Sequence, residues 1–204
     1  MLARQHWPGS LYTATGQRKY LTAAERTRFM ETALACSRAD LRTLCLTLAY
    51  TGCRISEALA LTVDRVEREA GFIAIRSLKK RKRAVVIREV PAPDALFIAL
   101  NEAHTFEDRS ARLWPISRSG AWHLVKGIMR EASVPEGAHM TPKGLRHSFG
   151  IHAIRSGVSL NLVQRWLGHA RLETTAIYAN VMNEEERNLA RRSWAAIERA
   201  LGTT

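Results

Sequence analysis

The chain has 204 residues, the length of one ordinary domain, and its 46% hydrophobic content excludes an extensively disordered protein. Thirty-one Lys and Arg against nineteen Asp and Glu give a formal net charge of +12, which favours a polyanionic partner; the alternatives are a solvated basic surface or an anionic membrane. No signal-peptide pattern and no run of about 18 apolar residues occurs, so we expect a cytoplasmic protein without a membrane span.

The N-terminal part of the chain is polar before it becomes helical. Residues 1–20 contain a proline, two glycines and scattered basic side chains, and we expect them to form an arm rather than a folded unit. A helix should follow Thr22, because Thr22 and Glu25 have the spacing of a capping box. Apolar residues at helical spacing extend this helix to about residue 36 and predict further helices at 40–51 and 55–61, separated by Gly52.

The period of the sequence changes after this helical region. Residues 71–78 and 83–90 are rich in β-branched side chains and partly alternate, which predicts two antiparallel strands joined by the basic turn KKRKR and ended by Pro91 and Pro93. Helices are then expected at 94–104, 119–134, 144–157 (with Thr141 as N-cap and Pro142 in the first turn), 159–169, 172–181 and 184–201. The fold class predicted is mainly α with a small antiparallel β-sheet, an α+β fold.

The three cysteines do not indicate a metal site. Cys36, Cys45 and Cys53 are odd in number, lack zinc-type spacing and lie in apolar helical sequence, so we expect buried free thiols. No phosphate-binding glycine loop occurs either. We therefore expect neither a metal nor a nucleotide cofactor.

Four segments carry the residues of interest for chemistry: TGCRISEAL (51–59), SLKKRKRAVV (77–86), TPKGLRHSF (141–149) and WLGHARLETTAIYANV (166–181). In this order they resemble the catalytic boxes of the tyrosine recombinase (phage integrase) family, and the similarity covers about residues 20–204. The resemblance implies the catalytic-domain fold shared with type IB topoisomerases. It also implies a site-specific recombinase or integrase that cleaves and rejoins DNA through a 3′-phosphotyrosine intermediate.

The resemblance assigns the main chemical roles. Tyr178 is the expected nucleophile, and the pentavalent phosphorane that its attack creates carries extra negative charge. Arg54 and Arg146 are expected to stabilise that charge, because a guanidinium donates paired hydrogen bonds and stays cationic. His169 is expected to donate to a non-bridging oxygen of the same phosphate or to assist proton movement.

The basic turn is expected to supply the general acid. In the family a lysine of this hairpin protonates the departing 5′-oxygen, and Lys79 lies closest to the family position, with Lys80 next. The other basic residues of the turn, Lys80, Lys82 and Arg83, are expected to contact DNA backbone phosphates.

One position departs from the commonest family pattern. Lys143 stands at a position where many recombinases have histidine, and type IB topoisomerases resemble this chain in having lysine there. Lysine keeps a cationic donor at this position, but it cannot act as a neutral base near pH 7 unless its pKa falls. The lysine therefore argues against removal of the Tyr178 proton by the residue at position 143. Glu57 is expected to hold an arginine or the hairpin in place, and we interpret His147 as a buried hydrogen-bonding residue rather than a catalyst.

The organisation expected from the resemblance is a catalytic domain at residues 21–204 without a separate N-terminal core-binding domain. The implied partners are double-stranded DNA, further copies of the chain in a tetrameric synapse on DNA, and an accessory recombinase. The helix at 184–201 would dock on a neighbouring subunit or pack on its own core. Two other functions remain open: a topoisomerase-like relaxing enzyme and a catalytically silent DNA-binding accessory protein.

Overall fold

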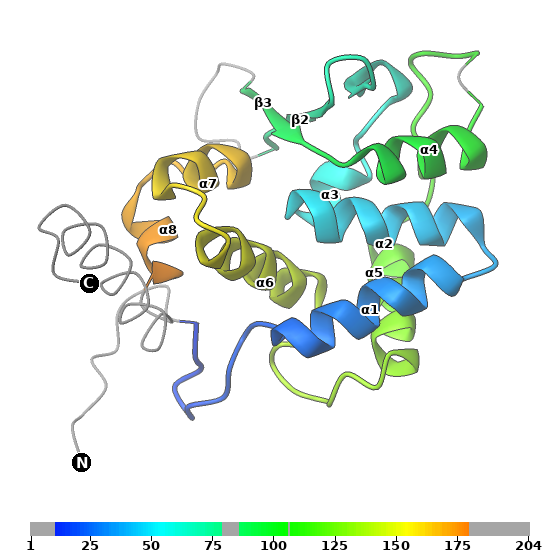
Figure 1. The fold of residues 1–204 in the computed structure, drawn as a ribbon. Helices are drawn as coiled ribbons and strands as arrows, with labels where there is room; N and C mark the ends of the chain where they lie inside the picture. The colour runs from blue at the N-terminus through cyan, green and yellow to red at the C-terminus, as the bar shows by residue number, and fades with distance from the viewer. Residues whose placement is uncertain (1–10, 79–85, 106, 180–204) are drawn as a thin grey trace, which may run out of the picture.

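The computed structural model describes residues 11–78, 86–105 and 107–179. Along the chain its elements are α1 (Ala23–Ala35), α2 (Ala39–Thr51), α3 (Ile55–Ala58), η1 (Val63–Arg65), β1 (Val66–Glu67), β2 (Phe72–Arg76), β3 (Ile87–Pro91), α4 (Asp94–Ala103), α5 (Arg118–Glu131), α6 (Pro142–Arg155), α7 (Leu160–Leu167) and α8 (Glu173–Ala176). This mainly helical fold with one small antiparallel sheet confirms the predicted fold class (Figure 1). None of the described helices is long and apolar enough to cross a membrane.

The boundaries of the first two helices follow from local sequence. The Thr22 hydroxyl accepts from the backbone N–H of Glu25, and the Glu25 carboxylate accepts from the backbone N–H of Thr22, so the predicted capping box is complete. α2 ends at Gly52, whose φ of 60° lies in the left-handed region that glycine enters without steric cost. This turn leads the chain directly into Arg54.

The sheet contains the predicted hairpin and one further strand. Its order is β1-β2-β3, and β2 pairs antiparallel with β3 from Phe72 opposite Pro91 to Arg76 opposite Ile87. The two-residue β1 was not predicted, because so short a strand shows no alternation. Pro91 is the last residue of β3, as its role in ending the strand predicts. Proline is tolerated at this position, where its missing N–H interrupts no hydrogen-bond ladder of the sheet.

Two predicted helices are shorter than expected. α3 covers only Ile55–Ala58. The helix expected at 172–181 is wrong at residues 177–179, where the chain tightens and the backbone N–H of Tyr178 donates to the carbonyl of Thr175; residues 180 and 181 lie outside the described residues. Tyr178 therefore lies in a turn after α8. The predicted helix at 184–201 lies outside the described residues.

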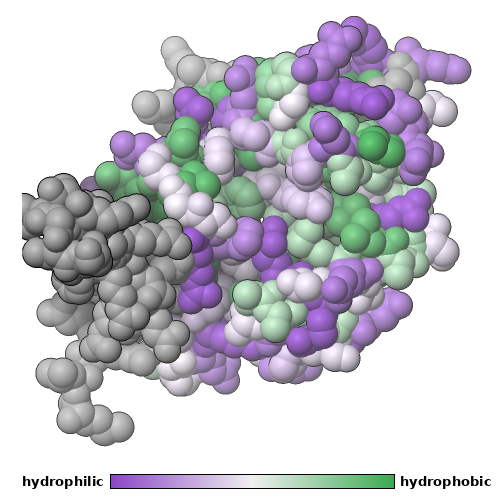
Figure 2. Space-filling view, viewed as in Figure 1, coloured by the Kyte–Doolittle hydropathy of each residue, from purple (hydrophilic) through white to green (hydrophobic). Residues whose placement is uncertain are grey.

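The larger core surrounds α2. This helix packs against α1, α4 and α6 (Figure 1), and most of its side chains are buried, which explains why its sequence is apolar on more than one face. α7 contacts β3, so the end of the hairpin lies beside the C-terminal helices. In the same orientation, Figure 2 shows hydrophilic residues over much of the surface and hydrophobic ones in separate groups.

A second, smaller core joins the N-terminal segment to the C-terminal helices. Leu11 is 3% exposed and belongs to the cluster formed by Phe149, Ile151, Ala153, Val163, Leu167 and Tyr178. Residues 11–20 bend back on themselves, with a bridge between Tyr12 and Arg18. The part of the expected arm that the structure describes is thus packed on the domain, and its Lys19 lines a cavity beside α3 and α6.

Candidate active site

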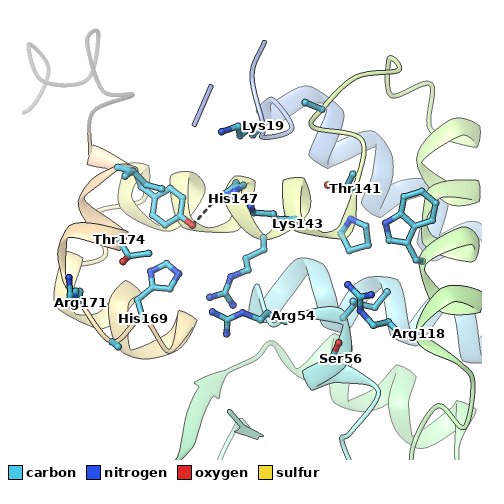
Figure 3. A pocket seen from close by; sticks show the side chains of 18 residues that line it. Lys19, Arg54, Ser56, Arg118, Thr141, Lys143, His147, His169, Arg171 and Thr174 are labelled. Atoms are coloured by element: carbon cyan, nitrogen blue, oxygen red, sulfur yellow. Dashed lines mark hydrogen bonds between the residues drawn. The ribbon is translucent and has the colours of Figure 1, made fainter. Parts of the chain in front are cut away.

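A cavity of about 880 Å³ opens where α3, α5, α6 and the segment after α7 meet (Figure 3). Its lining holds six Lys or Arg side chains and two histidines: Lys19, Arg54, Arg118, Lys143, Arg146, Arg171, His147 and His169. Among the residues that the structure describes, no Asp or Glu lines it. So strong an excess of positive charge in a concave site favours an anionic ligand.

Arg146 is fixed by the two segments that flank it. Its guanidinium donates from Nη1 to the carbonyl of Gly52 at 2.8 Å and from Nη2 to the carbonyl of Leu167 at 2.6 Å. The side chain is buried, and burial, followed by the nearby charge of Arg54, lowers its pKa to about 10, so it remains cationic at pH 7. Arg146 thereby joins the TGCR and LGH motifs in one site.

The start of α6 lies close against the preceding loop, and this close approach depends on the glycine of the motif KGLR. A Cβ at Gly144 would lie 1.8 Å from the carbonyl oxygen of His139, which no side chain tolerates. Gly144 also donates its backbone N–H to the Thr141 hydroxyl, the predicted N-cap of α6. The backbone contact and the cap together fix the position of the start of α6 beside the cavity.

Arg54 stands at the start of α3 and is oriented by Glu57. The Glu57 carboxylate accepts from the Arg54 backbone N–H at 2.9 Å and from Nη1 at 2.7 Å. It also accepts from Arg88 of β3. Burial raises the pKa of the Glu57 carboxyl, but the charges and hydrogen bonds of Arg88 and Arg54 outweigh burial and hold it below its usual value. Glu57 thus contacts both an arginine of the cavity and a strand of the hairpin.

Tyr178 lines the cavity from the turn after α8. Only 1% of its surface is exposed, and its ring packs on the bare backbone of Gly150, where a Cβ would come within 2.5 Å of the ring. Burial raises the pKa of Tyr178 to about 12, although Arg146 and Arg54 act to lower it. The phenol is therefore protonated at pH 7.

His169 follows the C-cap of α7, where Gly168 has a φ of 64°, as the sequence indicates. Its Nδ1 lies 2.9 Å from the hydroxyl of Thr175, and its ring stacks beside that of Tyr178 with centroids 6.3 Å apart. Burial lowers the pKa of His169 to about 3, with the charges of Arg146 and Arg54 acting in the same direction. It is a neutral hydrogen-bonding group at pH 7.

The structure brings Arg54, Lys143, Arg146, His169 and Tyr178 to one cavity, with Glu57 behind them. Lys143 is exposed at its edge. The hairpin residues Lys79, Lys80, Lys82 and Arg83 lie outside the described residues.

Several residues at the site were not singled out by sequence reasoning. Arg88 looked like any strand residue, and Thr175, Lys19, Arg118 and Trp122 carry no motif of their own. His147 was interpreted as a hydrogen-bonding residue, and its Nδ1 lies 3.2 Å from the Tyr178 hydroxyl (dashed line in Figure 3). Its position directly after Arg146 was the only available signal.

Comparison with known proteins agrees with this fold. Residues 19–185 match the model of the phage integrase family. The chain is 33% identical over 190 residues to "Tyrosine recombinase XerA" of Thermococcus kodakarensis, covering 90% of this chain and 65% of the relative. It is 31% identical over 156 residues to "Tyrosine recombinase XerD" of Halalkalibacterium halodurans, covering 71% of this chain and 50% of that relative.

Solved structures show the same relationship. The crystal structure of a XerA recombinase has a TM-score of 0.69 at 25% identity, over 85% of this chain and 64% of that one. The catalytic domain of bacteriophage HP1 integrase has a TM-score of 0.62 at 25% identity, over 84% of this chain and 93% of that domain. The chain belongs to the phage integrase family and has the fold of a tyrosine recombinase catalytic domain. It spans between half and two thirds of the length of the XerA and XerD relatives.

Proposed function

We propose that this chain is the catalytic domain of a site-specific DNA recombinase, in which Tyr178 attacks a phosphodiester and forms a 3′-phosphotyrosine link. The observation that carries the proposal is the cavity itself, which collects a tyrosine hydroxyl, two fixed arginines and a neutral histidine around one space. Family membership supports the same reaction, since relatives carry the name tyrosine recombinase.

The charges of the cavity suit a phosphoryl transition state. Arg146 is anchored by two backbone carbonyls and Arg54 by Glu57, so neither has to reorganise when negative charge develops on the phosphate. His169 adds a neutral donor that Thr175 helps to orient. Removal of one such preorganised donor slows a reaction by about 100–1000-fold.

The bonds of the proposed reaction balance without an external energy source. The bond between Tyr178 Oη and phosphorus forms as the bond from phosphorus to the 5′-oxygen breaks, and Lys79 of the hairpin donates a proton to that oxygen. Attack by a 5′-hydroxyl of a second DNA end reverses the step. The energy of the broken bond is kept in the phosphotyrosine link, so rejoining requires no nucleoside triphosphate.

The cavity extends beyond the space that one phosphate needs. A volume of about 880 Å³ is of the size that accommodates a ligand larger than a single phosphate group. In Figure 3, Arg118 lies on the far side of Arg54 from His169, and Trp122 lines the same space. We assign this extension to the DNA strand next to the scissile phosphate.

The test is capture of a covalent complex. The protein is incubated in EDTA with labelled supercoiled plasmid, including plasmid that carries the DNA flanking its own gene, and the reaction is quenched with detergent. We expect a protein–DNA adduct in the native chain and none in the Tyr178→Phe variant. An adduct that persists in the variant would identify another nucleophile, and loss of cleavage in EDTA would contradict the metal-free scheme. Recombined products distinguish a recombinase from a relaxing enzyme, which changes only the topology of the plasmid.

A further inference from the structure

We infer that His147 is a catalytic residue that accepts the proton from Tyr178 as the phenol oxygen attacks phosphorus. The inference rests on the proposed function, and it changes the interpretation of His147 drawn from the sequence. The geometry that carries it is direct: His147 Nδ1 lies 3.2 Å from Tyr178 Oη, within hydrogen-bond distance of the reacting atom.

The position of His147 on α6 is rigid. It follows Arg146, whose guanidinium is held by two carbonyls, and α6 begins at the Thr141 cap and continues through the buried Phe149 and Gly150. The ring of Tyr178 packs on Gly150, one turn further along the same helix. One helix therefore positions both the phosphate-binding arginine and the imidazole against the phenol.

The protonation state of His147 suits an acceptor. Burial, followed by the charges of Lys143, Arg146 and Lys19, lowers its pKa to about 4, so the imidazole is neutral at pH 7 and has a lone pair for the phenol O–H. The titratable groups that face it are Lys143 and Arg146 of α6, Lys19 of the N-terminal segment, and His169 and Tyr178 after α7.

Arrival of DNA would change this balance in the direction that catalysis needs. In the free protein the proton stays on the phenol, since the pKa of Tyr178 is about 12. A phosphodiester bound by Arg54 and Arg146 brings a negative charge beside His147, which offsets the neighbouring cations and favours the imidazolium. The imidazole then becomes a stronger base at the moment when the phenol is attacked.

The other polar groups near the phenol are less suited to this role. Lys143 is a cation exposed at the edge of the cavity, and an ammonium group has no lone pair. His169 has its Nδ1 within hydrogen-bond distance of Thr175 and presents its ring to the ring of Tyr178, with an interplanar angle of 22°. His147 is the histidine whose nitrogen lies at the hydroxyl.

The step balances as follows. The Tyr178 O–H bond breaks, its proton passes to Nδ1 of His147, and the Oη–phosphorus bond forms. The bond to the 5′-oxygen breaks and that oxygen takes a proton from the hairpin lysine. When the strands rejoin, the imidazolium returns its proton to Tyr178 Oη as the phenolate leaves.

The experiment compares His147→Asn with the native chain. Asparagine places an amide oxygen near the position of Nδ1, so it can still accept a hydrogen bond and orient the phenol, but it cannot take the proton. His147→Ala removes both functions. His152→Asn, an exposed histidine further along α6, is the matched control. The rate of Tyr178-dependent adduct formation is measured from pH 6 to pH 10, together with DNA affinity and melting temperature.

We expect His147→Asn to slow adduct formation at pH 7 by about 100-fold or more, with DNA affinity unchanged. Its rate should rise about tenfold per pH unit, because hydroxide must then remove the proton, whereas the native rate should change little. A ring-fluorinated tyrosine at position 178, which has a more acidic phenol, should restore much of the lost rate. His152→Asn should behave as the native chain.

Two results would overturn the inference. The first is an adduct rate in His147→Asn within a few fold of the native rate across the pH range, because orientation alone would then explain the contact. The second needs no variant: NMR titration of the His147 imidazole should show its pKa rising when a DNA duplex binds, and an unchanged pKa refutes the proton transfer even if the variants do not fold. Absence of any adduct from the native chain would instead count against the proposed function itself.

Discussion

Arg88 of β3 and Glu57 of α3 form a buried ion pair, with Arg88 Nη2 2.6 Å from Glu57 Oε2 and side chains only 4% and 2% exposed. The same arginine donates from Nε to the carbonyl of Trp166 at 2.7 Å, near the end of α7. Since Glu57 also orients Arg54, one carboxylate connects the hairpin strand, α7 and a cation of the cavity. Because Arg88 pairs with Ile75 near the turn end of the hairpin, the strand that leads out of the turn with the predicted general acid is held at the site.

The first prediction follows from this pair. Arg88→Met should destabilise the fold by about 3–5 kcal/mol, because it leaves the Glu57 carboxylate buried with one partner fewer. Adduct formation should fall as well, since the Glu57 carboxylate that orients Arg54 loses one of the two side chains that hold it. Urea unfolding and the covalent-complex assay measure the two effects.

A double variant separates stability from function. Arg88→Met combined with Glu57→Leu removes both charges, so much of the lost stability should return, while adduct formation stays low because Arg54 remains unsupported. Full recovery of adduct formation in the double variant would show that the pair supports only the fold.

The second prediction concerns the backbone under the nucleophile. Gly150→Ala would place a methyl group 2.5 Å from the Tyr178 ring in the present geometry, so the ring must move. We expect a loss of about 1–3 kcal/mol in stability and a large loss of adduct formation, although every polar group of the site is retained. Gly127→Ala on α5, where a Cβ meets nothing within 4 Å, is the control and should stabilise the protein by about 0.5–1 kcal/mol. Equal adduct yields from both variants would mean that the ring position has little importance.

The sequence predicts most of this fold because its signals are local. The capping box at Thr22, the glycine at position 52 and the alternating strands each act within a few residues, and each appears where expected. The helix expected at 172–181 fails for a tertiary reason: the chain tightens after α8 to place Tyr178 on Gly150, and helical spacing does not report that contact.

The residues of the site likewise fall into those that the sequence predicts and those that only the packing reveals. Motifs locate Arg54, Arg146, His169 and Tyr178, since these lie in recognisable segments. Arg88 is invisible in the sequence, because its importance comes from a carboxylate 31 positions away in the chain. The contact of His147 with the phenol is likewise a product of packing between α6 and the turn after α8.

The third prediction is a loss of stability in mild acid. The pKa values of His147 and His169 fall on folding from about 6.5 to about 4 and about 3, so the unfolded chain binds more protons between these values. Their contribution is complete above pH 6.5 and declines as the pH falls towards 4. From pH 6.5 to 5 each should account for about 1.5 kcal/mol of the unfolding free energy.

Unfolding in urea at several pH values measures this slope, and the double variant His147→Asn, His169→Asn should reduce it. His104, His139 and His152, whose pKa values are also lowered by burial, contribute the remaining slope. The Glu57 carboxyl, whose pKa lies below its usual range, loses its contribution only at lower pH and should not affect this window. A slope unchanged in the double variant would show that other groups are responsible.

The fourth prediction tests the extension of the cavity towards α5. If Arg118 neutralises one DNA phosphate, Arg118→Ala should weaken binding to a duplex at every salt concentration and reduce the slope of log affinity against log salt by about 1. Arg68→Ala, an exposed arginine before β2 that does not line the cavity, has the same change of charge and serves as the control. Fluorescence anisotropy with one labelled duplex from 50 to 300 mM salt, roughly the range over which phosphate contacts weaken, gives both slopes. The assignment of this extension to DNA requires the Arg118 variant to have the shallower slope of the two. Equal slopes for the two variants would place Arg118 away from the nucleic acid, and the DNA contact would then be restricted to the end of the cavity around Tyr178.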